Sequence, residues 1–93
     1  MSTRNLFRAV NLEIRHLTRR WEGETTRFEA VCECDDASCA LAISVDRALF
    51  DAAADQPGHY VVAAAHRPRD GERIVRRDSE AVVVERRPEP VTT

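Results

Sequence analysis

The sequence predicts a small single domain of the α+β class, with its elements in the order α-β-β-α-β-β-β. Length and composition give the first reason, because 93 residues with 43% hydrophobic and 32% charged side chains suit one globular domain. Periodicity gives the second reason. One long segment repeats its apolar residues every three to four positions, as a helix does, and later segments alternate with the two-residue period of strands. Turn signals between neighbouring strands give the third reason, because they predict antiparallel hairpins.

The first element is a helix predicted from Arg4 to Trp21 and ended by Gly23. We expect one apolar stripe of this helix to face the core, formed by Phe7, Val10, Ile14, Leu17 and Trp21 with Leu6 beside them. A second, basic stripe is expected to face solvent, with Leu12 next to it. Its four members are Arg4, Arg8, Arg15 and Arg19.

Two short strands are predicted next, from Thr25 to Cys32 and from Ala40 to Val45. Between them, the polar and acidic segment from Glu33 to Ser38 suits a turn. The two strands are therefore expected to form a hairpin around the cysteine-rich loop.

A short helix is predicted from Val45 to Ala54, where Pro57-Gly58 then breaks the pattern. Ser44 is the expected N-cap, and Asp46 in the first turn favours the helix dipole. The expected inner face consists of Val45, Leu49, Ala52 and Ala53.

A third strand is predicted from His59 to His66, and strict alternation places these two histidines on opposite faces. The segments Arg73 to Arg77 and Glu80 to Arg86 are expected to form a terminal hairpin that turns at Asp78-Ser79. The last strand is rich in valine, which suits a strand covered on one or both faces.

Composition also bears on location and on partners. The formal net charge of −2 disfavours the strongly basic surface of a dedicated nucleic-acid binder. No apolar run approaches the roughly 20 residues of a membrane span, and the N-terminus has no apolar signal region. We therefore expect a cytoplasmic protein without membrane contact, with a domain over residues 1–87 and a disordered tail over residues 88–93.

Three cysteines fall within eight residues, at Cys32, Cys34 and Cys39. An odd number of cysteines cannot pair completely within one chain, so a cluster of metal ligands in a reducing compartment is favoured over a disulfide framework. Zinc takes four sulfur or nitrogen ligands at tetrahedral corners, and Cys₃His is a known structural type. We expect a structural Zn²⁺ on the three cysteines, with His66 as the fourth ligand and His59 as the second choice.

The acidic residues of the same loop, Glu33, Asp35 and Asp36, are interpreted as a solvated turn and not as ligands. They would raise the pKa of nearby thiols, which disfavours a reactive thiolate without metal. Two alternatives stay open at this point. The cysteines could be small buried core residues while His66 only caps a strand, or the cluster could serve redox chemistry.

Several strings occur together over nearly the whole chain: Phe7-Arg8-Ala9-Val10-Asn11, Cys32-Glu33-Cys34 with Cys39, and Tyr60-Val61-Val62 ahead of His66. In this respect the sequence resembles a group of small actinobacterial proteins. They carry a Phe-Arg-x-Val-Asn helix start, a Cys-Glu-Cys-x4-Cys loop and a later histidine. The resemblance implies that the three cysteines and one histidine belong together, which supports the metal site. It implies no biological function.

We expect a protein-binding or regulatory module and not an enzyme. The sequence assembles no nucleophile, base and oxyanion donors and has no phosphate-cradling glycine loop. The first helix would dock an acidic protein surface through its partner-binding residues, Arg4, Arg8, Leu12, Arg15 and Arg19. The alternatives are a zinc-containing nucleic-acid-binding regulator that uses the same arginines, and a thiol-based redox sensor or enzyme.

Overall fold

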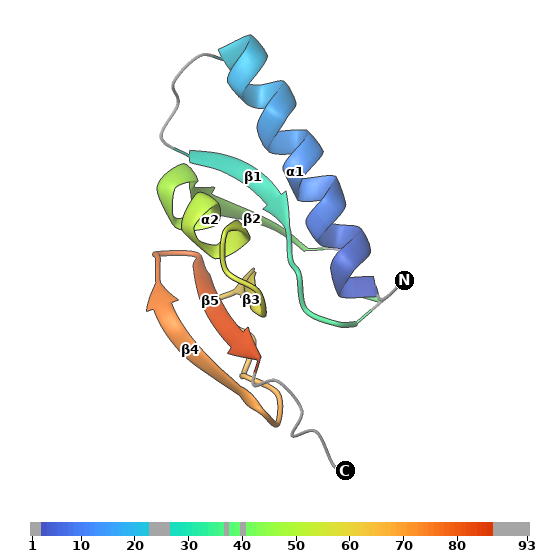
Figure 1. The fold of residues 1–93 in the computed structure, drawn as a ribbon, viewed down its shortest axis with the longest axis vertical. Helices are drawn as coiled ribbons and strands as arrows, with labels where there is room; N and C mark the ends of the chain where they lie inside the picture. Colours follow the sequence, from blue (N-terminus) through green and yellow to red (C-terminus); the bar gives the residue numbers. More distant parts are fainter. Residues whose placement is uncertain (1–2, 23–26, 37, 40, 87–93) are drawn as a thin grey trace.

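The computed structural model describes residues 3–22, 27–36, 38–39 and 41–86, with the side chains of residues 18–22 excepted. In this part of the chain the elements follow the predicted order (Figure 1). They are α1 (Thr3–Glu22), β1 (Arg27–Val31), β2 (Ala42–Asp46), α2 (Arg47–Ala54), β3 (His59–Ala63), β4 (Glu72–Arg77) and β5 (Ala81–Arg86). The predicted tail of residues 88–93 lies outside the described residues.

The strands form two antiparallel sheets, which confirms the α+β class. β1 pairs with β2, so that Arg27 lies opposite Asp46 and Val31 opposite Ala42. The second sheet has the strand order β3-β5-β4. β5 is its central strand, and the valine run from Val82 to Val84 is buried throughout.

α2 contacts both β2 and β3, and so lies where the two sheets meet (Figure 1). Its Phe50 ring packs edge-to-face against Phe28 of β1, with ring centroids 5.2 Å apart. Buried side chains from both sheets surround this pair in one core. Within the described residues, no helix combines the length and apolar character that crossing a bilayer requires.

The start of α2 corrects the expected cap. Asp46 and not Ser44 is the N-cap, because its carboxylate accepts a hydrogen bond from the N–H of Leu49 at 3.1 Å. Val45 consequently belongs to β2, and the buried face of α2 is formed by Phe50 and Ala53.

The third strand is shorter than expected. β3 ends at Ala63, which pairs with Ala81, the first residue of β5. One further backbone hydrogen bond, from the Ala64 N–H to the Glu80 carbonyl at 3.1 Å, follows this last pair of the ladder. The chain then turns, and the N–H of His66 donates to the carbonyl of Ala63 at 2.9 Å.

The terminal hairpin is confirmed, and its turn is closed by a hydrogen bond from the Asp78 N–H to the Ala81 carbonyl at 2.7 Å.

α1 is rotated about its axis relative to the expected orientation. Leu6, Val10 and Leu17, which we call the outer ridge, are 51%, 39% and 45% exposed, whereas Phe7 and Ile14 are half-buried. The side chain of Trp21 lies outside the described residues. The apolar stripe predicted to face the core is thus largely solvent-facing.

The basic stripe predicted to face solvent points inward instead. Arg4 is 3% exposed and Arg8 is half-buried, and each forms an ion pair with a carboxylate from another element. Arg15 is half-buried and paired with Asp51. Leu12 is exposed as expected, and the side chain of Arg19 lies outside the described residues. The fold tolerates these inward-pointing arginines because the burial of a polar group costs little free energy once the group is paired.

This orientation predicts that the outer ridge contributes little to stability. Replacing Leu6 or Leu17 by serine should change the free energy of unfolding by less than about 0.5 kcal/mol, as is usual at exposed sites. Ile14→Ser is the matched control on the same helix and should cost more than 1 kcal/mol, because Ile14 packs against the core. Urea unfolding measures all three. A cost at Leu17 equal to that at Ile14 would show that the predicted orientation of α1 was correct after all.

Asp78, in the turn between β4 and β5, ties the two sheets together. Its carboxylate pairs with the Arg27 guanidinium of β1 at 3.0 Å and accepts the backbone N–H of Asp46 at 3.1 Å. The hydrogen bond from Arg27 is the main cause that holds the pKa of Asp78 below its usual 3.8.

We expect Asp78→Asn to destabilise the domain at neutral pH by about 1 kcal/mol, a modest value because water screens the partly exposed pair. A lowered folded-state pKa stabilises the fold above the unfolded-state pKa, and this contribution is lost as the pH falls through the folded-state value. The difference between wild type and variant should therefore shrink below pH 4. Thermal melts at pH 7 and pH 3 test this, with Asp70→Asn in the exposed β3–β4 loop as control. A difference that grows on acidification contradicts the assignment.

Candidate metal centre

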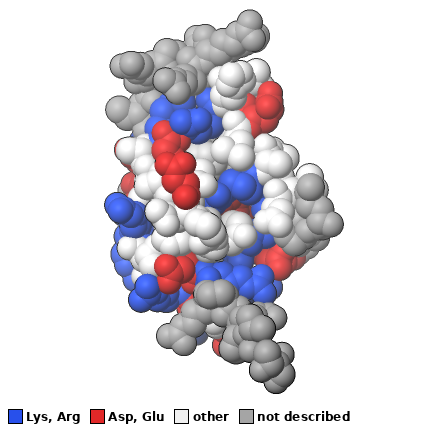
Figure 2. Space-filling view, viewed as in Figure 1, with Lys and Arg blue, Asp and Glu red and all other residues white. Residues whose placement is uncertain are grey.

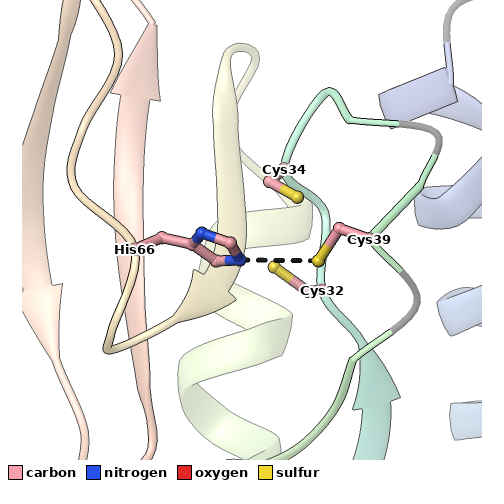
Figure 3. A group of neighbouring side chains, drawn as sticks. All are labelled: Cys32, Cys34, Cys39 and His66. Atoms are coloured by element: carbon pink, nitrogen blue, oxygen red, sulfur yellow. Dashed lines mark hydrogen bonds between the residues drawn. The ribbon is translucent and has the colours of Figure 1, made fainter.

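Two segments that are distant in sequence bring four donor residues together (Figure 3). Cys32 directly follows β1, while Cys34 and Cys39 lie in the loop that leads to β2. His66 comes from the turn after β3, in the other sheet, and its ring approaches the sulfur atoms from the opposite side (Figure 3). The group therefore joins the β1–β2 hairpin to the three-stranded sheet.

Backbone hydrogen bonds hold the two segments in place. The Cys32 N–H donates to the Leu41 carbonyl at 2.8 Å, which extends the pairing of the hairpin beyond β1. The next residue, Glu33, donates its N–H to the Val61 carbonyl of β3 at 2.8 Å. The Cys39 N–H closes a turn on the Asp36 carbonyl at 3.0 Å, which returns the chain toward β2. Main-chain hydrogen bonds thus fix Cys32, Cys39 and the residue that precedes Cys34.

The donor atoms have the spacing that a tetrahedral ion needs. All four lie within 4.8 Å of one another, and the Cys39 Sγ is 3.5 Å from the His66 Nε2. Around a tetrahedral zinc ion, a sulfur and a nitrogen ligand are about 3.5 Å apart and two sulfurs about 3.8 Å. The widest pair needs to move by only about 1 Å. The four residues that the sequence predicted as ligands therefore fit one metal ion.

Burial keeps two of the thiols protonated when nothing else binds them. Cys32 and Cys34 are buried, whereas Cys39 and His66 are half-buried. Burial raises the pKa of the Cys32 thiol to about 12 and also raises the pKa of Cys34. The N–H of Ala63 donates to the Cys32 sulfur at 3.3 Å and partly opposes this shift. A bound cation would stabilise the thiolate form of these cysteines, because cysteine binds zinc as a thiolate.

Glu33, between two of the cysteines, is the largest departure from the sequence interpretation. It was expected in a solvated turn, yet its side chain is fully buried. The Arg8 guanidinium donates to both carboxylate oxygens at 2.8 Å. The Asn11 amide and the Val61 N–H add further hydrogen bonds, each at 2.9 Å. The carboxylate therefore has four donors and is not available as a metal ligand.

Asn11 and Arg4 complete this polar contact between α1 and the loop that follows β1. The Asn11 amide accepts from the Val31 N–H at 2.7 Å and donates to the Val31 carbonyl at 2.8 Å, as a neighbouring strand would do. Arg4 donates to the Glu33 carbonyl at 2.8 Å and pairs with Glu72 at 2.5 Å. We call Arg8, Asn11 and Glu33 the carboxylate clasp.

Sequence reasoning missed the carboxylate clasp, although a signal was available. Arg8 and Asn11 are three residues apart and so share one face of a helix. They occur in the Phe-Arg-x-Val-Asn string, while Glu33 occurs in the Cys-Glu-Cys string, so the two motifs quoted for the resemblance meet in space. The buried partners explain why the arginines of α1 point inward.

His59 and His66 occupy different environments. His66 belongs to the donor group. His59 is the first residue of β3, at the other end of that strand, and its Nε2 lies 3.0 Å from a carboxylate oxygen of Glu85. His66 was selected because it was expected to end a strand, and that reason is wrong, since β3 ends at Ala63. The turn that follows brings its ring to the cysteines.

We therefore expect His66→Ala to weaken zinc affinity at least about 100-fold, since losses beyond the direct ligands already cost 10- to 100-fold. His59→Ala is the matched control and should leave the affinity within about threefold of wild type. Competition with a fluorescent zinc indicator measures both. Equal losses at the two histidines would contradict the ligand assignment.

Comparison of the chain with protein-family models, with curated proteins and with solved structures finds no match. What the fold and the site themselves define is an α+β domain with a Cys₃His group that can hold a metal ion.

Proposed function

We propose that the protein is a zinc-stabilised binding module in which Zn²⁺ on Cys32, Cys34, Cys39 and His66 has a structural role. The observation that carries the proposal is the convergence of the four donor atoms within 4.8 Å. Three thiolates and one imidazole in tetrahedral spacing suit zinc. Four protein ligands would fill its coordination shell, which favours a structural ion over a catalytic one. The free thiols agree with a reducing compartment, so we propose a cytoplasmic location.

Metal content tests this proposal directly. Protein purified under reducing conditions should contain close to one zinc per chain by elemental analysis. Removal of the metal with a chelator should lower the melting temperature, because metal binding and folding are coupled in small domains. Metal-free protein whose melting temperature is the same before and after zinc addition would refute the proposal.

The outer ridge of α1 supports a protein-binding role. Three apolar side chains along one helix face are exposed, and exposed apolar patches of this kind are typical of contact sites. The acidic partner expected from the basic stripe is not part of this proposal, because Arg4 and Arg8 are bound to Glu72 and Glu33.

Photo-crosslinking in the native host tests the protein-binding role. A photoreactive residue at Leu17 should capture a discrete partner, whereas the same residue at the exposed Glu80 should not. Identical crosslinking patterns at the two positions would contradict a contact site on α1.

Basic and acidic side chains are interspersed on the face shown in Figure 2, which weighs against the nucleic-acid alternative.

A further inference from the structure

A small cleft of about 70 Å³ opens beside the metal centre. Cys34 and His66, two of the four donor residues, line it. The segment after His66 forms part of its wall, with Arg67 and Arg69, both of which are exposed. The metal centre is therefore reachable from solvent on this side, although Cys32 and Cys34 are themselves buried.

The other charged groups of the cleft are engaged in contacts with neighbours. Arg4 and Glu72 pair with each other at 2.5 Å and are nearly buried. The Asp36 carboxylate accepts hydrogen bonds from the N–H and the hydroxyl of Ser38, at 2.9 and 2.7 Å. Among the exposed residues that line the cleft, two are basic, Arg67 and Arg69, and one is acidic, Asp36, a balance that attracts small anions.

We infer that this cleft is the exchange route of the metal centre, through which small anions with carboxylate or thiolate donors reach the ion. The inference rests on the zinc site proposed above. The chemistry is a ligand substitution without oxidation. A donor lone pair of the incoming anion forms a bond to zinc, the bond to the His66 Nε2 breaks, and the imidazole keeps its own lone pair.

Charge explains why arginines suit this position. Zn²⁺ with three thiolates and a neutral imidazole carries a net charge of −1, and replacement of the imidazole by an anion makes it more negative. Arg67 and Arg69 oppose this accumulation of charge and raise the local concentration of the anion. His66 is the ligand expected to leave, because it is half-buried, lines the cleft and is neutral.

The test compares zinc removal by an anionic and an uncharged chelator. The variant is Arg67→Gln/Arg69→Gln, and the matched control is Arg76→Gln/Arg77→Gln, which removes two exposed arginines from β4. At low salt, EDTA should remove zinc from the first variant about 3- to 10-fold more slowly than from wild type and control. The uncharged chelator TPEN should act equally on all three proteins, and 1 M salt should abolish the difference with EDTA.

Two results would overturn the inference. EDTA rates equal to wild type would show that the arginines do not guide anions. Slower removal by both chelators would show that they only stabilise the site. Zinc content is measured before each experiment, so a protein that holds no zinc refutes the proposed function and is distinguished from a failure of the exchange route.

Discussion

Cys34→Ala should remove bound zinc and lower the melting temperature by about 20 °C or more. The described residues between β1 and β2 (32–36, 38–39 and 41) form no helix or strand, and the donor group joins this loop to the other sheet. Loss of the ion should therefore cost about 4 kcal/mol or more, a large part of the 5–15 kcal/mol that stabilises a typical domain. Circular dichroism melts and elemental analysis measure the two effects together.

The controls for this variant separate metal loss from loop damage. Ser38→Ala lies in the same loop, removes an exposed hydroxyl and should cost less than about 1 kcal/mol. Wild type treated with a chelator should melt within a few degrees of Cys34→Ala, because both lack the ion. A further drop when the chelator is added to Cys34→Ala would show that the residue does not act through metal.

Glu33→Ala should destabilise the domain by about 3–5 kcal/mol. The change leaves the Arg8 guanidinium without its carboxylate, and the Asn11 amide and the Val61 N–H each lose an acceptor. Removal of one partner from a buried ion pair is costly for this reason. Because Glu33 lies between two cysteines of the proposed zinc site, zinc affinity should fall as well. Urea unfolding and metal competition measure the two losses.

Glu29→Ala is the matched control, since Glu29 is an exposed glutamate of β1. It should change stability by less than about 0.5 kcal/mol. The double variant Arg8→Ala/Glu33→Ala should cost less than the sum of the two single changes, because the second change removes a group that the first has left unpaired. Strict additivity would contradict the carboxylate clasp.

Element order was predictable because it depends on local pattern. Turn residues and apolar periodicity lie within short windows of sequence, and they correctly predicted the helices, the hairpins and the turn at Asp78-Ser79. The end of β3 was not predictable in the same way. It depends on where β5 begins, since Ala63 pairs with Ala81, whereas Ala64 and Ala65 continue the apolar pattern in the sequence although the chain turns there.

The orientation of α1 depends on long-range pairing. Periodicity shows which stripe of a helix is apolar, and it predicts burial of that stripe only if the polar stripe has no buried partner. Here the Glu33 carboxylate accepts a hydrogen bond from Arg8, and the Asn11 side chain accepts one from the Val31 N–H at the edge of β1. The polar stripe therefore has buried partners and faces the core. These partners are more than 19 residues away in sequence, outside the reach of a local pattern.

The grouping of the four donor residues was predictable from residue type and not from strand geometry. Three clustered cysteines need a fourth donor, and few residues in this chain can supply it. His66 does lie beside the three cysteines, even though its expected position at a strand end was wrong. Arg67 and Arg69 were not identified as site residues, because the cleft they line exists only once the β3–β4 loop folds against the cysteines.

X-ray absorption at the zinc edge, on protein purified in reducing buffer, tests whether zinc binds to Cys32, Cys34, Cys39 and His66. We expect three sulfur ligands at about 2.3 Å and one nitrogen ligand at about 2.0–2.1 Å. In His66→Ala the sulfur shell should persist while the imidazole signal disappears. A zinc ion surrounded by oxygen and nitrogen alone, or a purified protein whose cysteines are oxidised and hold no metal, would contradict this expectation.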